Sequence, residues 1–102
     1  MTGTEELLER TLAWRVSVLP SVVEVSRRGL SAHVRLAGRP GERVAVLVAA
    51  AARRRGVRLR ATGDVVVLHA PRSVSDPDLC RLVAVLASSI AEVAIRPLPA
   101  AA

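Results

Sequence analysis

The sequence is most informative in what it lacks. It has no lysine, phenylalanine or tyrosine, and only one cysteine and one tryptophan among 102 residues. A Schiff base with a carbonyl cofactor requires a lysine amine, so no side chain of this sequence can form one. The lone Cys80 excludes an internal disulfide. With Trp14 as its one aromatic residue, the chain offers no stacking surface of the kind that single-strand nucleic-acid binders use.

Other absences limit the cellular locations and the kinds of reactive site that the sequence allows. The longest apolar run, residues 44–52, is far shorter than the ~20 residues that cross a bilayer, and the acidic N-terminus is no signal peptide, so a cytoplasmic protein without a membrane partner is expected. His33, His69 and Cys80 do not have the spacing of metal ligands, and no metal is expected. There is no glycine-rich phosphate loop or nucleophile elbow. An independent enzyme is therefore disfavoured, and no catalytic residue is assigned.

The residues that are present describe a small, basic, aliphatic domain. Hydrophobic residues make up 51% of the chain, which excludes a disordered polymer. All 15 basic residues are arginine and the net charge is +6, a bias that is typical of a GC-rich bacterial gene. The length fits one domain, which we place at residues 1–96, followed by a flexible tail at 97–102.

The hydrophobic pattern predicts seven elements. A first helix, capped at Thr2 or Thr4 with Glu5 completing a capping box, ends at Pro20. Two strands at 22–27 and 30–36 precede the Gly38–Gly41 loop, and a second helix then buries Val44, Leu47, Val48 and Ala51 and stops at Gly56. Strands at 57–61 and 65–68 flank a turn at 62–64, and a third helix, with Asp76 as N-cap, ends before Pro97.

This pattern predicts an α+β fold of order α-β-β-α-β-β-α, with helices packed on one face of an antiparallel-rich sheet. Arg58 and Arg60 alternate with Val57, Leu59 and Ala61, so they lie on the opposite face. The apolar run 65–68 predicts an interior strand covered on both faces. Trp14, beside the apolar stripe of the first helix, is assigned a packing role, and His33 that of a solvated strand residue.

Four segments share an order and wording with a known family. They are residues 19–30, 50–57, 56–68 and 70–79, and the third contains Gly56-Val57-Arg58-Leu59-Arg60 followed by Gly63-Asp64. Together they resemble the C-terminal small domain of class III, pyridoxal-phosphate-dependent aminotransferases. The third is similar to the diaminopelargonate aminotransferase pattern G-V-W-[IL]-R-P-F-G, and the fourth to P-P-L-x-I-S-D-x-E-L. The likeness covers roughly residues 5–95.

The resemblance implies part of an enzyme. Family members carry the Schiff-base lysine and most cofactor contacts in a large domain, so this chain would be inactive alone and would bind pyridoxal phosphate only with a large-domain partner. Arg60 falls on the position of the arginine that holds the substrate carboxylate in the biotin-pathway enzyme. In the acetylornithine branch that role belongs to an arginine at the position of Leu68. Arg58 replaces the aromatic residue beside the first arginine, and Arg72 interrupts the Pro-Pro segment.

Two functions remain open from the sequence. One is a stand-alone or split small domain that completes or regulates a separately encoded large domain, or that forms a homo-oligomer; within the same hypothesis the chain can be the remnant of a truncated enzyme. The other is a basic module that binds nucleic acid or protein and has no enzymatic role. Judged by its strand pattern alone, Arg60 also fits an ordinary solvated arginine.

Overall fold

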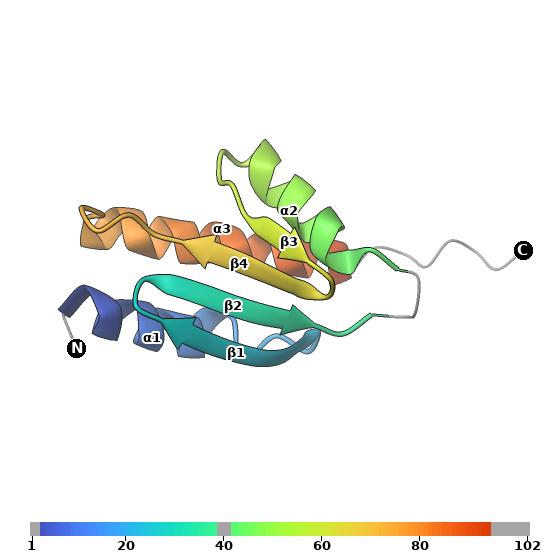
Figure 1. Cartoon of the computed structure of the whole chain (residues 1–102), viewed down its shortest axis with the longest axis horizontal. Coiled ribbons are helices and arrows are strands. Elements are labelled where there is room, and N and C mark those ends of the chain that lie inside the picture. Colours follow the sequence, from blue (N-terminus) through green and yellow to red (C-terminus); the bar gives the residue numbers. More distant parts are fainter. Residues whose placement is uncertain (1–2, 39–41, 95–102) are drawn as a thin grey trace, which may run out of the picture.

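The centre of the fold is a four-stranded antiparallel sheet (Figure 1). The computed structural model describes residues 3–38 and 42–94. The strands pair in the order β1-β2-β4-β3. Their bounds are β1 (Val22–Arg28), β2 (Ser31–Leu36), β3 (Arg60–Thr62) and β4 (Val65–His69). The helices are α1 (Gly3–Arg15), α2 (Val44–Arg54) and α3 (Asp76–Ala94). The predicted element order is confirmed.

All three helices pack on the same face of the sheet, as predicted (Figure 1). The long helix α3 lies between the other two and contacts both. The core that they enclose is aliphatic and draws on every helix and on the two central strands. Its largest fully buried apolar residues are Leu8, Val16, Val34, Val48, Val66, Leu68, Leu79, Val83, Leu86 and Ile90.

The hairpins show why these strands turn where they do. Gly29 and Gly63 have φ angles of 59° and 60°, a left-handed backbone that glycine adopts without a steric cost. The predicted turn is therefore confirmed at residues 63 and 64, whereas Thr62 is the last residue of β3. The strand that precedes it is shorter than predicted, because β3 begins only at Arg60. The Val57 amide donates to the Ala52 carbonyl at 3.0 Å, so residue 57 completes the end of α2 and does not pair with β4.

The first helix differs from the prediction at its end. It stops at Arg15 and not at Pro20, because the amides of Val16 and Ser17 both donate to the Leu12 carbonyl and the chain then continues in turns. The packing role of Trp14 is wrong within the described residues, since its side chain is 79% exposed. The burial of an aromatic residue at the edge of an apolar helical stripe depends on whether a neighbouring element covers it, and the sequence pattern does not specify that neighbour.

Two further details of the helices are corrected. On α2, Leu47 was expected in the core but is 37% exposed, and the buried residues are Ala45, Val48, Ala51 and Ala52. Because α2 is apolar nearly all round, periodicity could not fix its rotation. At the start of α3 the cap is Ser75 and not Asp76, since the Asp78 amide donates to the Ser75 hydroxyl at 3.3 Å.

Some predictions concern residues outside the described ranges. These residues are Thr2, most of the Gly38–Gly41 loop, and the tail at 97–102 with Pro97. Among the helices that are described, none combines the length and apolar character needed to cross a membrane.

Candidate functional site

The sheet face opposite the helices is the face that can act on another molecule. We call it the open face. The strand register places on it Glu24, Ser26, Arg28, Ser31, His33, Arg35, Arg60, Thr62, Val65, Val67 and His69. No described helix or strand covers it (Figure 1). The expectation that residues 65–68 are covered on both faces is therefore wrong, because Val65 and Val67 remain partly exposed.

Arg60 lies on the open face, as its alternation with apolar residues predicted. It pairs with Val67, which in turn pairs with His33, so Arg60 and His33 share one row across the sheet. Adjacent strands are ~4.8 Å apart, so β3 and β2, which carry these two residues on either side of β4, are about 10 Å apart. The Arg60 side chain is exposed, and it makes no hydrogen bond or ion pair with the described residues. Its guanidinium is thus available for an external carboxylate.

Arg58 was predicted to share the face of Arg60, but the structure separates them. Arg58 precedes β3 and borders a shallow groove formed with one side of α2, whose lining includes Val46 and Arg53. Only one of the two arginines therefore belongs to the open face. Arg58, which replaces the aromatic residue of the family pattern, therefore does not supply a second cation beside Arg60.

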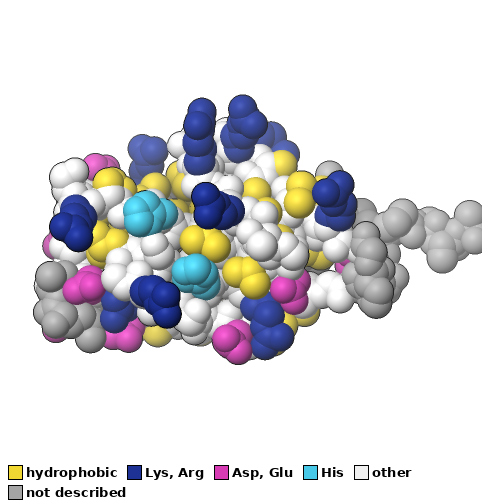
Figure 2. Space-filling view, viewed as in Figure 1, with side chains coloured by type: hydrophobic (Ala, Val, Ile, Leu, Met, Phe, Trp, Pro, Cys, Tyr) yellow, Lys and Arg dark blue, Asp and Glu magenta, His cyan; other side chains and the backbone are white. Residues whose placement is uncertain are grey.

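Charge on the open face is predominantly positive (Figure 2). Glu24 is its one acidic side chain, and it accepts a hydrogen bond from Arg35 at 3.3 Å. Both histidines of the chain lie on this face (Figure 2). The His69 ring nitrogen Nδ1 is 2.6 Å from the Ser31 hydroxyl oxygen. The open face can therefore attract and hydrogen-bond an anion.

The remaining candidate residues form no reactive centre. Cys80 is exposed on α3, on the helical side of the sheet. Within residues 3–38 and 42–94, no three His, Cys, Asp or Glu side chains are grouped so that they could hold a metal ion. Leu68 is 2% exposed and points into the core, so a side chain at that position on this backbone faces the helices.

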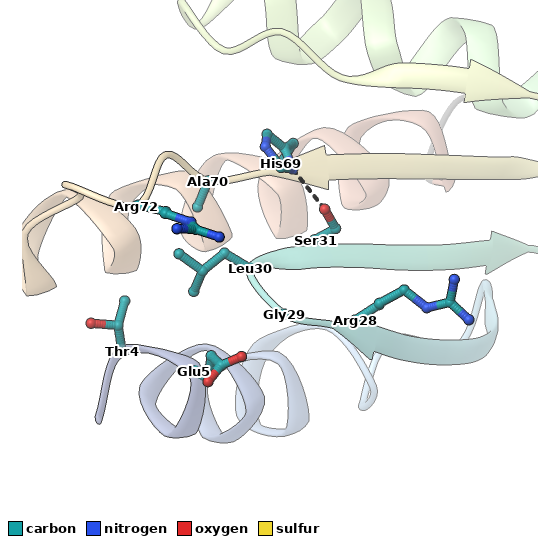
Figure 3. Close-up of a pocket in the computed structure, with 9 residues that line it drawn as sticks. All are labelled: Thr4, Glu5, Arg28, Gly29, Leu30, Ser31, His69, Ala70 and Arg72. Carbon is teal, nitrogen blue, oxygen red and sulfur yellow. Dashed lines mark hydrogen bonds between the residues drawn. The ribbon is translucent and has the colours of Figure 1, made fainter. Parts of the chain in front are cut away.

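Sequence reasoning missed one feature, a hollow at the turn between β1 and β2. It is lined by Thr4, Glu5, Arg28, Gly29, Leu30, Ser31, His69, Ala70 and Arg72, and its volume is ≈ 590 Å³ (Figure 3). We call it the hairpin hollow. Its one signal in the sequence was that Arg72 interrupts the Pro-Pro segment of the family pattern. Three separate stretches of the chain build it, residues 4–5, 28–31 and 69–72, so only the fold could bring them together.

The side chains of this chain do not fit pyridoxal phosphate on their own. The sequence has no lysine, so no amine is available for the covalent link to the cofactor aldehyde. A cofactor-dependent reaction would therefore need the lysine of another polypeptide region.

Relatives of the chain are longer enzymes. No family model matches the chain. In an alignment 81 residues long that covers 72% of the chain, it is 37% identical to the adenosylmethionine-8-amino-7-oxononanoate aminotransferase of Nitratidesulfovibrio vulgaris. A transaminase structure obtained by ancestral reconstruction matches 93% of the chain with a TM-score of 0.85 and 25% identity. The chain is a class III aminotransferase-related domain.

Two more solved structures share the fold of this aminotransferase-related domain. The adenosylmethionine-8-amino-7-oxononanoate aminotransferase of Methanocaldococcus jannaschii matches 86% of it with a TM-score of 0.79 and 23% identity. The acetylornithine aminotransferase of Elizabethkingia anophelis matches 87% with a TM-score of 0.76 and 18% identity. The domain spans 15% of the Nitratidesulfovibrio enzyme and 22% to 23% of the three structures. It corresponds to a fragment of an aminotransferase.

Proposed function

We propose that the domain works as the small domain of a class III, pyridoxal-phosphate-dependent aminotransferase in the cytoplasm. In this proposal it completes a separately encoded large domain that supplies the lysine and the cofactor. The observation that carries the proposal is a 37% identical match to about one seventh of an aminotransferase, in a chain that contains no lysine. Alone, the domain has no transaminase activity.

The open face supports this role because it presents the chemistry of an interface. Val65 and Val67 lie partly exposed at its centre, and burying them against a large domain would release water from apolar surface. Arg28 and Arg60 are exposed and make no hydrogen bond or ion pair within the described part of the chain. We infer that this face points toward the large domain and its cleft.

In this arrangement Arg60 holds the carboxylate of the substrate. A guanidinium can donate two parallel hydrogen bonds to a carboxylate, which fixes both the position and the orientation of the bound acid. The pyridoxal phosphate bound by the partner supplies the electron-withdrawing ring for amino transfer. Arg60 supplies binding and orientation, and it takes no part in proton transfer.

The first test is capture of the tagged chain from its native cells. We expect a stoichiometric partner that contains a lysine-bearing aminotransferase large domain, together with the absorbance of bound pyridoxal phosphate. Recovery of the chain without a partner and without a chromophore would overturn the proposed function.

The second test uses the reconstituted pair. We expect Arg60→Ala to lower kcat/KM by about 10- to 100-fold, the range for losing a hydrogen-bonded charge pair, and Arg60→Lys to recover part of the loss. Arg81→Ala is the matched control, because Arg81 is exposed on α3 on the opposite side of the sheet. An equal effect of the two alanine variants would exclude a specific role for Arg60.

The alternative of nucleic-acid binding has its own measurement. Its support is the net charge of +6, while the sole aromatic residue leaves no stacking platform. Binding through phosphates weakens steeply as salt rises. Gel shifts between 50 and 200 mM salt that show tight binding with this dependence would favour the alternative over the aminotransferase role.

A further inference from the structure

The hairpin hollow combines cationic, hydrogen-bonding and apolar groups at one end of the sheet. Its lining comes from the start of α1, the β1–β2 turn, the end of β4 and the loop that follows β4 (Figure 3). The partly exposed Leu30 provides the accessible apolar part, whereas Ala70 is buried. Figure 3 shows the Arg72 side chain extending from the loop after β4 toward these two residues. A guanidinium is thus directed over an apolar surface.

The charge of the hollow is positive and largely uncompensated. Arg28 and Arg72 are exposed, and neither makes an ion pair or hydrogen bond with any described residue. The one carboxylate of the lining, Glu5, is 3.8 Å from the guanidinium of Arg27, on the helix side of β1. Arg27 therefore offsets the charge of Glu5, and the two lining arginines remain to attract an anion.

The Ser31–His69 pair adds a hydrogen-bond donor whichever tautomer the ring adopts. If the Ser31 hydroxyl donates to Nδ1 across the 2.6 Å contact, the ring carries its proton on Nε2 and that N–H is free. If Nδ1 carries the proton and donates to Ser31, the hydroxyl hydrogen is free. The pair therefore always keeps a donor that the described residues do not use.

We propose that the hairpin hollow is a binding site for a small organic anion, with its carboxylate or phosphate group on Arg72 and the Ser31–His69 pair and its carbon portion on Leu30. A guanidinium and a neutral donor together suit an oxyanion, whose several lone pairs accept from both. Arg28 lies at the rim. Figure 3 shows its side chain running along the sheet away from the Ser31–His69 pair, so it contributes long-range attraction and no direct contact. This site is separate from Arg60 and does not depend on the proposed aminotransferase role.

The test is a titration of the full chain, without any partner, followed by the amide resonances of Ser31, His69 and Ala70. The probes are inorganic phosphate, acetate and butyrate at constant ionic strength. We expect saturable shifts at these residues, and tighter binding of butyrate than of acetate because Leu30 contacts its longer carbon chain. Tighter binding of phosphate than of both acids would identify phosphate esters as the ligand source, and the reverse would identify carboxylates.

Two variants and a matched control make the test specific. Arg72→Gln should weaken binding about tenfold or more, the effect of losing a charge-assisted hydrogen bond, and Ser31→Ala about threefold. Arg81→Gln removes the same charge from α3 and should leave binding unchanged. Both arginines are exposed, so neither change threatens folding. Equal weakening by Arg72→Gln and Arg81→Gln, or the absence of saturable shifts with all three probes, would overturn the proposal.

Discussion

The two faces of the sheet carry the same residue types in opposite environments. In β4, Val66 is fully buried beneath the helices, whereas its neighbour Val67 is partly exposed on the open face. In β1, the side chain of Arg27 is 16% exposed beside α1, whereas Arg28 is exposed and unpaired among the described residues. Neighbouring residues of a strand point to opposite faces, so one side chain packs against the helices and the next is accessible to another molecule. The covered face stabilises the fold and the open face is left for binding.

The largest expected effect compares Val66→Ala with Val67→Ala. Both substitutions remove the same two methyl groups from one strand, so the loss of β propensity is shared. Val66→Ala should lower the free energy of unfolding by about 2 kcal/mol, because it also leaves a cavity in the core, and Val67→Ala by less than about 1 kcal/mol. Urea unfolding of both variants measures the difference. Equal losses would show that the open face is as well packed as the core.

A second comparison is Arg27→Ala with Arg28→Ala. Arg27 donates to the Gly29 carbonyl at 2.8 Å and lies 3.8 and 4.0 Å from Glu5 and Glu9 of α1, so it joins β1 to that helix. Its removal should cost about 1–2 kcal/mol of unfolding free energy and leave the half-buried Glu5 without this cation. Arg28→Ala should cost less than about 0.5 kcal/mol. Thermal unfolding of the two variants decides whether burial or charge alone sets the cost.

The smallest effect concerns an exposed contact on the helix side. Glu92 of α3 pairs with Arg54 and with Arg55, the second at 2.9 Å, and all three side chains are at least one third exposed. Glu92→Gln should lower the unfolding free energy by about 0.5 kcal/mol, an effect that vanishes at 1 M salt. Unfolding at low and high salt measures it. If Glu92→Gln lowered the unfolding free energy as much as Arg27→Ala does, the cost of losing an ion pair would depend on the side of the sheet on which it lies more than on its burial.

Much of the fold could be predicted because those parts of it depend on local sequence patterns alone. The alternation of Ala32, Val34 and Leu36 with polar residues marked a half-buried strand, and those three residues are buried. Gly63 marked a turn that requires a positive φ. The stripe of α3 also held, with Leu79, Leu86 and other members of it in the core. Each of these features needs only a period or a single backbone angle.

Other features needed neighbours that the pattern does not specify. The rotation of α2 depends on how closely its alanines approach β4 and α3, so Leu47 could not be assigned from periodicity. Trp14 is exposed because no described element extends over it. The Ser75 cap depends on the backbone angle at one residue, and both Ser75 and Asp76 are good capping residues.

The sequence by itself determined the order of the elements, the aliphatic core, the face on which Arg60 lies, and the need for a lysine from elsewhere. These follow from periodicity, from composition and from the chemistry of single side chains. Tertiary structure alone decided that the second face of the sheet is uncovered, that Arg58 lies apart from Arg60, and that Ser31, His69 and Arg72 meet in one hollow. The last three residues are separated by up to 41 positions, and the pairing of β2 with β4 places Ser31 beside His69.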